Sequence, residues 1–355
     1  MTKAGKVSLR KIFKRHGAFT ALHGIDLDIE PGEFFALLGP SGSGKTTTLR
    51  ILAGLDEPSE GEVFLDGSNI TNSEPGDRDV AMVFQSYALY PHMNVYQNIA
   101  FPMRMVGMPK SEIDIAVRDA ARKVHIEHLL ERKPGQLSGG QQQRCALARA
   151  IVRKPRLFLL DEPLSNLDAK LRLETRGELK KLQRSLGVTT VYVTHDQEEA
   201  MTIADRMAVF MEGRIAQMGT PKSIFDRPQT ADVANFIGSP PMNLIPATYR
   251  DGKVHIGEYE LQTSCRVGGE RNVIAGIRPS SVRLGQTGIP ARVDLIENLG
   301  DAFLVDLTLQ GMTIRARTGV EMAWREGETV SFSADPSSVH LFDSETRIRI
   351  DARAP

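Results

Sequence analysis

Short runs of apolar residues alternate with stretches of helical periodicity over the first two-thirds of the chain. Residues 34–38, 157–160 and 188–193 are apolar or β-branched throughout, which is the pattern of strands that are covered on both faces. Between them lie stretches in which apolar residues recur every three or four positions. Strands and helices in this order predict a mostly parallel sheet with helices on its faces, an α/β fold.

The pattern changes after about residue 236. Residues 238–241 read Gly-Ser-Pro-Pro, which is typical of a linker, and apolar and polar residues then alternate with a period of two. Residues 303–309 and 312–316 have this alternation on either side of a predicted turn at Gln310-Gly311, and residues 330–334 repeat it. The sequence therefore predicts an α/β domain over residues 1–236 and a small β-barrel domain over residues 237–355.

Charge and cysteine content narrow the class of protein. The 44 basic and 44 acidic residues cancel, so the chain has no global attraction to nucleic acid or to anionic membranes. Cys145 and Cys265 form no Cys-x-x-Cys pair, which predicts neither a disulfide framework nor a zinc site and favours a reducing cytosol. No apolar stretch approaches the roughly 20 residues that span a bilayer. We therefore expect any connection to a membrane to run through a partner.

A glycine-rich stretch follows the first apolar run. Residues 39–46 read Gly-Pro-Ser-Gly-Ser-Gly-Lys-Thr, which matches the phosphate-binding pattern of Gly, four residues, Gly, Lys and Ser or Thr. Glycines let backbone N–H groups surround phosphates, and the start of the next helix adds partial positive charge. Lys45 is expected to reach the outer phosphates and the Thr46 hydroxyl to bind Mg²⁺. The predicted ATP-binding residues of this stretch are Gly39, Pro40, Ser41, Gly42, Ser43, Gly44, Lys45, Thr46 and Thr47.

Two adjacent carboxylates, Asp161 and Glu162, follow the second apolar run. Ligands of open α/β sheets bind beyond the carboxyl ends of the strands, so these acids are expected beside the glycine-rich loop. One carboxylate at this place can hold Mg²⁺ opposite Thr46 while the next orients a water molecule. Guanine recognition is not indicated, because no Asn-Lys-x-Asp follows a later strand.

A second glycine-led helix start lies further along the chain. Ser138 is a natural N-cap, and Gly139 and Gly140 would let a second phosphate group approach backbone N–H donors. An amphipathic helix is predicted to follow. The residues of this second anion-binding segment are Leu137, Ser138, Gly139, Gly140 and Gln141.

With these motifs in place, nearly the whole chain resembles the ATP-binding cassette family. In that family two subunits meet head to tail, and each ATP lies between the phosphate loop of one subunit and the signature segment of the other, here residues 137–141. The resemblance implies catalytic roles for Gln85, Glu162 and His195: Glu162 activates water, His195 holds the γ-phosphate, and Gln85 contacts Mg²⁺ or the water. It implies that Asp168 couples the two sites of the homodimer. The implied metal ligands are Thr46, Gln85 and Asp161.

The adenine position departs from the pattern of the family. Members usually place an aromatic residue near the amino terminus to stack on the base, and register with Leu27 puts His16 there. An imidazole ring can stack, with a smaller face. Phe19 is the alternative.

Further segments resemble importer subunits for sugars and related small polar solutes, of the maltose and glycerol-phosphate type. These segments are residues 81–92, 98–102, 238–243 and 276–279. The resemblance implies a helical subdomain at about residues 87–150 and an oligonucleotide-binding-like barrel of the TOBE type as the tail. It further implies two transmembrane permease subunits, an indirect extracytoplasmic solute-binding partner, and a peripheral location on the cytoplasmic face of the cell membrane. Importers of polyamine, iron or sulfate remain alternatives.

A nucleic-acid ATPase with the same chemistry is the competing class. Such proteins insert a long coiled coil between the two phosphate-binding segments, and no sustained heptad region occurs here. Aromatic residues of the tail, such as Phe303 and Phe332, follow the period of two and are expected in its core, with no basic stripe beside them. We therefore expect no direct contact with nucleic acid.

Overall fold

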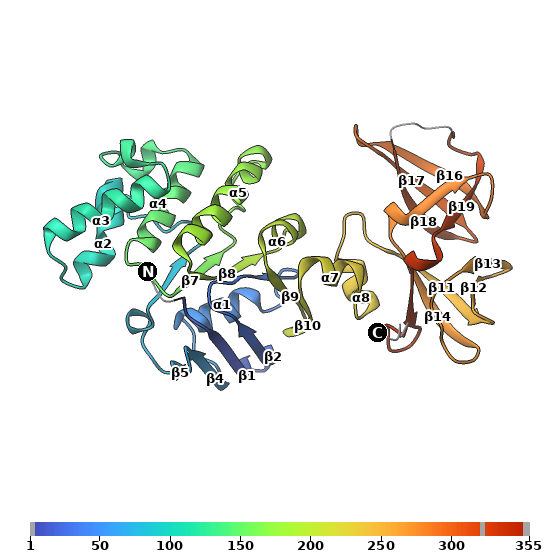
Figure 1. Ribbon diagram of the computed structural model, residues 1–355, viewed down its shortest axis with the longest axis horizontal. Helices are drawn as coiled ribbons and strands as arrows, with labels where there is room; N and C mark the ends of the chain where they lie inside the picture. The colour runs from blue at the N-terminus through green and yellow to red at the C-terminus, as the bar shows by residue number, and fades with distance from the viewer. Residues whose placement is uncertain (1–3, 320–323, 351–355) are drawn as a thin grey trace. The chain divides into compact units, whose positions relative to one another are not determined.

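The computed structural model describes residues 4–319 and 324–350, which form two compact units divided between Pro221 and Lys222 (Figure 1). The first unit is built around a six-stranded sheet of order β10-β9-β3-β8-β7-β6. Strands β3, β6, β7, β8 and β9 are parallel, and β10 is antiparallel to β9. The bounds are β3 Phe34–Leu38, β6 Val80–Val83, β7 Leu157–Asp161, β8 Thr189–Thr194, β9 Arg206–Met211 and β10 Arg214–Gly219. All three strands predicted from the apolar runs are present.

Successive residues of these strands pack into two different cores. In β3, Phe34 joins a cluster with helical residues, whereas Phe35 joins a cluster on the opposite face. In β8, Tyr192 and Val193 divide in the same way. Because both faces of the sheet are covered, both sets of alternating side chains must be apolar, which explains the uninterrupted runs in the sequence.

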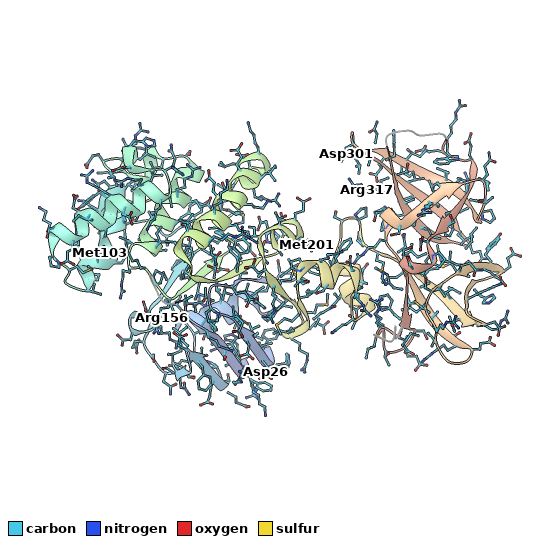
Figure 2. All side chains as sticks on the ribbon, viewed as in Figure 1. Asp26, Met103, Arg156, Met201, Asp301 and Arg317 are labelled. Atoms are coloured by element: carbon cyan, nitrogen blue, oxygen red, sulfur yellow. The ribbon has the colours of Figure 1, made fainter. Side chains whose placement is uncertain are left out.

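One face of the sheet shares its core with an antiparallel sheet and with α1, Lys45–Ala53. The antiparallel sheet has the order β2-β1-β4-β5. Its strands are β1 Val7–His16, β2 Phe19–Ile29, β4 Glu60–Leu65 and β5 Ser68–Asn69. Arg156, labelled in Figure 2, forms ion pairs of 2.9 Å with Asp66 and 3.0 Å with Asp79, and thus fastens the β4–β5 turn to the start of β6.

The other face is covered by helices. Figure 1 shows α2, α3 and α4 gathered together, and they lie in the range where the helical subdomain was predicted, with α4 ending one residue beyond it. The bounds are α2 Val95–Met105, α3 Lys110–Lys123, α4 Gly139–Ile151, α5 Ala169–Leu186 and α6 Gln197–Ile203. None of the helices in the described part of the chain combines the length and apolarity that crossing a bilayer requires.

The second unit begins with two short helices, α7 Pro221–Asp226 and α8 Ala231–Phe236, and continues as two antiparallel sheets. The predicted period-two strands are present, with a turn at Gln310-Gly311 between β17 and β18. One sheet has the order β13-β12-β11-β14-β20, with bounds Tyr259–Gln262, Lys253–Ile256, Asn243–Arg250, Arg271–Ile277 and Val339–Asp343. The other has the order β15-β19-β16-β17-β18, with bounds Val282–Gly285, Thr329–Ala334, Ile289–Asn298, Phe303–Leu309 and Met312–Thr318.

Helix α8 packs with the second unit. Ala231 and Ala234 share a small core with Met242, Ile274 and Phe342. This packing agrees with the division of the chain between Pro221 and Lys222, which comes before the change of sequence pattern at residue 236.

Candidate functional site

The glycine-rich loop connects the end of β3 to the start of α1, the context that a phosphate-binding loop requires. Gly44 caps α1 with a φ of 101°, a conformation that favours glycine. A Cβ atom at Gly44 would lie 2.6 Å from Leu22 Cδ2, and one at Gly39 would lie 2.3 Å from the carbonyl oxygen of Phe210. Both positions therefore exclude side chains, which keeps the loop compact and its backbone accessible.

Lys45 is buried within this loop, with 4% of its surface exposed. Its Nζ donates hydrogen bonds of 2.8 Å to the carbonyl oxygens of Gly39 and Pro40. Desolvation lowers the pKa of Lys45, with Glu162 and Asp161 opposing that shift. Ser43 Oγ is buried without a hydrogen-bond partner. The loop thus holds a cation and an orphaned hydroxyl, both of which suit an anionic ligand.

Asp161 ends β7 directly beside the start of α1. Thr46 Oγ1 donates a hydrogen bond of 3.1 Å to Asp161 Oδ1. Desolvation raises the pKa of Asp161, and the hydrogen bond from Thr46 opposes that shift. A hydroxyl and a carboxylate in contact are the kind of oxygen donors that Mg²⁺ takes.

Glu162 and His195 come together at the ends of two neighbouring strands. β7 pairs with β8 in parallel register through Asp161 and Val193, and the Glu162 N–H donates to the Val193 carbonyl at 3.1 Å. This register places His195 Nδ1 3.1 Å from Glu162 Oε2. Glu162 adopts a φ of 44°, which is uncommon for a residue other than glycine, and residues in such strained conformations cluster at functional sites.

Gln85 is exposed just after β6, and the structure brings its backbone to the segment that follows Glu162. Asn166 Nδ2 donates a hydrogen bond of 2.8 Å to the carbonyl oxygen of Gln85. Asp168 ends that segment and caps α5, because its Oδ1 accepts from the Leu171 N–H at 2.9 Å. The segment of residues 165–168 therefore connects Gln85 to the start of α5.

The signature segment, residues 137–141, forms the start of α4 as predicted. Ser138 Oγ accepts from the Gln141 N–H at 3.4 Å, while Gln141 Oε1 accepts from the Ser138 N–H at 3.0 Å, a capping box. A Cβ atom at Gly140 would lie 2.9 Å from Leu171 Cδ2 of α5. Within its own chain the signature segment thus packs beside α5, next to Asp168.

His16 and Phe19 lie at the tip of the hairpin between β1 and β2, where they pair directly across the turn. Both are exposed, and Phe19 has 63% of its surface open to solvent. The hairpin therefore presents two aromatic rings, and its geometry does not favour His16 over Phe19 as the base-stacking residue.

The residues after Gln85 divide between core and surface. Tyr87 is 5% exposed and belongs to the helical core, whereas the ring of Tyr90 packs in a tilted arrangement against the ring of Phe101, with 4.7 Å between the ring centres. Arg149 of α4 holds this segment, donating to the carbonyl oxygens of Tyr87 at 2.8 Å and Ala88 at 2.6 Å. Arg149 was not predicted from the sequence, where its only signal is a basic residue in an amphipathic helix.

A cleft of about 380 Å³ borders the same segment. A larger cleft of about 850 Å³ lies against α2 and α3, bordered by Met103, which is labelled in Figure 2. The smaller cleft is lined by Ala81, Tyr90, Phe101, Pro102, Met105 and Arg149, among others.

Comparison with known proteins identifies the family. The model of the ABC transporter family matches residues 22–165, the MalK OB fold domain matches residues 238–281, and the TOBE domain matches residues 275–342. The trehalose/maltose import ATP-binding protein MalK of Thermococcus litoralis is 50% identical over 364 residues, covering 96% of this chain and 98% of the relative. The chain belongs to the ABC transporter family.

Other ABC relatives match over similar lengths. The sn-glycerol-3-phosphate import ATP-binding protein UgpC of Cereibacter sphaeroides is 44% identical over 349 residues, 97% of this chain and 99% of the relative. The sulfoquinovosyl glycerol transport ATP-binding protein SmoE of Agrobacterium fabrum is 44% identical over 350 residues, 96% of this chain and 98% of the relative. The ABC ATPase fold and the β-rich OB and TOBE tail are thereby confirmed.

Solved ABC structures resemble the first unit. The dimeric post-hydrolysis state of the ATP-binding cassette MJ0796 bound to ADP and Pi has a TM-score of 0.55 and 33% identity, covering 61% of this chain and 98% of that one. The protein cbiO1 from Clostridium perfringens has a TM-score of 0.58 and 32% identity, covering 62% of this chain and 90% of that one. This chain is accordingly an ATP-binding ABC ATPase.

Proposed function

We propose that this chain hydrolyses ATP to drive the import of a sugar or a related small polar solute, as a homodimer bound to two transmembrane permease subunits. The names of the relatives support this class of cargo. The observation that carries the proposal is the Glu162–His195 pair at 3.1 Å, next to the Thr46–Asp161 pair at the same edge of the sheet.

ATP binds in this proposal through its phosphates to residues 39–47. Lys45 exchanges its carbonyl partners for phosphate oxygens, because a charged acceptor is a stronger partner for an ammonium group than a carbonyl. Thr46 and Asp161, with Gln85, hold Mg²⁺, which when bound neutralises developing negative charge on the phosphates. The contact between Thr46 and Asp161 supports this assignment, because it already brings two oxygen donors together.

Catalysis then depends on positioning and charge rather than on covalent chemistry. Glu162 accepts a hydrogen bond from the attacking water and orients it, and His195 binds the γ-phosphate. Gln85 contacts the same region and reports its occupancy through the segment that follows it. The distance of 3.1 Å between His195 Nδ1 and Glu162 Oε2 supports these roles, because it places both side chains in one site.

The second subunit contributes its signature segment to each ATP. Residues 137–141 offer a capped helix N-terminus with two glycines, which suits the binding of a phosphate group. In its own chain this segment packs beside α5 and the segment that contains Asp168. We assign Asp168 to the contact between the two sites of the homodimer.

The permease subunits dock on the helices between residues 87 and 150. The smaller cleft is lined mostly by apolar side chains together with Asp79, Arg149 and Arg153, a surface that fits the apolar face of a short helix, whereas about half of the residues that line the larger cleft are charged. The ATPase domain of this proposal covers residues 1–236, and residues 237–355 form the regulatory domain. The assembly lies peripherally on the cytoplasmic face of the cell membrane, works with an extracytoplasmic solute-binding protein and binds no nucleic acid directly.

The stalled variant Glu162→Gln tests the dimer and the role of Glu162 together. We expect it to bind Mg-ATP but not to turn it over, and to sediment as a dimer with Mg-ATP and as a monomer with ADP. Glu57→Gln makes the same chemical change at an exposed acid and should hydrolyse ATP normally. Rapid hydrolysis by Glu162→Gln would exclude the assigned role, and a strictly monomeric stalled form, with its membrane partners present, would exclude the dimer.

A screen of solutes against the ATPase rate of the co-purified transporter complex identifies the cargo. We expect stimulation by a sugar or polyol phosphate presented with the solute-binding protein. Stimulation by a polyamine, by iron or by sulfate instead would replace the proposed class of cargo and leave the ATPase assignment intact.

A further inference from the structure

Arg172 of α5 contacts two segments of the site at once. Its Nη2 donates a hydrogen bond of 3.1 Å to the carbonyl oxygen of Leu167, which precedes Asp168. Its Nη1 lies 3.4 Å from Oδ2 of Asp196, which is the residue after His195. One guanidinium group therefore joins the segment that follows Glu162 to the turn that carries His195.

The turn around His195 is itself held by polar contacts on both sides. Before it, Thr194 Oγ1 donates to Glu199 Oε2 at 2.6 Å and accepts from the Asp196 N–H at 2.9 Å. After it, Asp196 Oδ1 accepts from the N–H groups of Glu198 at 2.8 Å and Glu199 at 3.2 Å. The backbone of His195 is thus bracketed by two residues whose side chains have fixed partners.

Glu199 is the buried centre of this arrangement, with 4% of its side chain exposed. The Tyr192 hydroxyl donates to its Oε2 at 2.6 Å, and burial together with Glu199 raises the pKa of Tyr192, so that the hydroxyl remains a donor. Arg172 Nε lies 3.9 Å from Glu199 Oε1 and is buried without a hydrogen bond. A buried carboxylate is costly unless a cation compensates it, so Arg172 is held to Glu199 as well as to Asp196.

The segment of residues 165–168, which Arg172 contacts through Leu167, also forms a hydrogen bond with Gln85. Asn166 Nδ2 donates to the Gln85 carbonyl at 2.8 Å, and Leu167, the next residue, accepts from Arg172. Residues 165–168 therefore lie between the two segments that carry Gln85 and His195, with Arg172 as the connection on the His195 side.

We propose that Arg172 is a positioning residue that holds residues 165–168 and the His195 turn as one unit, and so keeps His195 directed at Glu162. Arg172 acts through other groups of the protein: among the described residues its hydrogen bonds and ion pairs go to Leu167, Asp196 and Glu199, and none goes to the phosphate loop. This inference rests on the proposed roles of Glu162 and His195. It predicts that loss of Arg172 lowers the rate of hydrolysis and leaves the affinity for ATP unchanged.

A purely structural role predicts a different result. Lys180 of α5 also fastens this helix to α6, at the far end from His195, through the Ile203 carbonyl and Asp205. If Arg172 served only to attach α5 to α6, Lys180→Gln would lower the rate as much as Arg172→Gln. Lys180→Gln is therefore the matched control.

The test compares Arg172→Gln, Asp196→Asn and Lys180→Gln in the co-purified transporter complex. Asparagine at position 196 retains the helix cap and removes only the charge. We expect kcat to fall about tenfold or more in Arg172→Gln, with KM and the Kd for ATP within about twofold of wild type. Asp196→Asn should lower kcat in the same direction, and the double variant should be no slower than Arg172→Gln, because both changes break one connection. Arg172→Lys should recover part of the rate.

A kcat for Arg172→Gln within about twofold of wild type would overturn the inference, and so would an equal loss in Lys180→Gln. A parallel loss of ATP affinity in Arg172→Gln would also reject it, since the phosphate loop should be unaffected. The wild-type rate is measured first. Absence of wild-type turnover would reject the proposed function itself, whereas normal turnover by Arg172→Gln rejects only the role of Arg172.

Discussion

Lys45 Nζ lies 2.8 Å from the carbonyl oxygen of Gly39, at the opposite end of the phosphate loop. The contact draws the two ends of the loop together around a buried cation, and burial lowers the pKa of that cation. The carbonyl groups that now accept from Lys45 carry no net charge. A phosphate group that displaces them would supply the negative charge that pairs with the ammonium group. The loop is thus preorganised for an anion by the same side chain that closes it.

Lys45→Ala should therefore weaken ATP binding. Loss of one charge-assisted contact of about 1.5–3 kcal/mol corresponds to a Kd roughly 10- to 150-fold higher, which titration calorimetry with Mg-ATP measures. Lys222→Ala removes a lysine whose side chain is 86% exposed and serves as the control. Equal affinity of Lys45→Ala and wild type would contradict the phosphate-loop assignment.

The residue that stacks on adenine can be identified by comparing the binding of ATP with that of tripolyphosphate, which has no base. We expect His16→Ala to weaken binding of ATP about fivefold, since a stacked ring contributes roughly 1 kcal/mol, and to leave the binding of inorganic tripolyphosphate unchanged. Phe19→Ala is measured in parallel, because Phe19 pairs with His16 across the hairpin. If only Phe19→Ala shows the selective loss, the adenine contact belongs to Phe19.

Gly238 leaves room for the side chain of a buried arginine, Arg278, in the second unit. Arg278 is 5% exposed and donates to the carbonyl oxygens of Phe225 at 2.9 Å and Ala234 at 3.1 Å, and to that of Ile237. Gly238 has a φ of 111°, and a Cβ atom there would lie 2.7 Å from Arg278 Nη1. This contact joins the two segments, residues 238–243 and 276–279, whose sequences resemble importer subunits: Gly238 belongs to the first and Arg278 to the second.

Gly238→Ala should destabilise the second unit by about 1–3 kcal/mol, through backbone strain and displaced hydrogen bonds. Calorimetric unfolding of the full-length chain measures the effect. Gly268→Ala is the control, because no atom lies within 4 Å of its added Cβ and its φ is not positive. An unfolding transition that is unchanged in Gly238→Ala would show that Arg278 tolerates the added methyl group.

Cys145 should resist alkylation in the folded protein. Burial raises the pKa of its thiol to about 12, so at pH 8 only about one molecule in ten thousand carries the reactive thiolate. Iodoacetamide at pH 8, followed by mass spectrometry, should label Cys145 only after unfolding in denaturant. Labelling of the native chain at the rate of the unfolded one would show that α4 opens readily.

Local chemistry made much of the site predictable. The phosphate loop is a contiguous stretch in which each residue type has a direct physical reason, and the helix cap at Ser138 is set by residues only three positions apart. The convergence of Glu162 and His195 was predictable from the rule that parallel strands end at one edge. The position of the helical subdomain along the chain was also predictable. The different surroundings of Tyr87 and Tyr90 were not, because both are tyrosines of one segment and only the folded chain places Tyr87 in the core and Tyr90 at a cleft.

By itself the sequence determined the α/β and all-β units, the family, and the residues that can meet a nucleotide, because periodicity and contiguous motifs carry that information. Only the tertiary structure decided that Arg172 meets Asp196, that Asn166 meets Gln85 and that Gly238 makes room for Arg278. Each of these pairs joins residues far apart in the chain, and no local pattern marks which distant carboxylate or carbonyl a cation will face. The partners are selected by strand register and helix packing, which exist only in the folded chain.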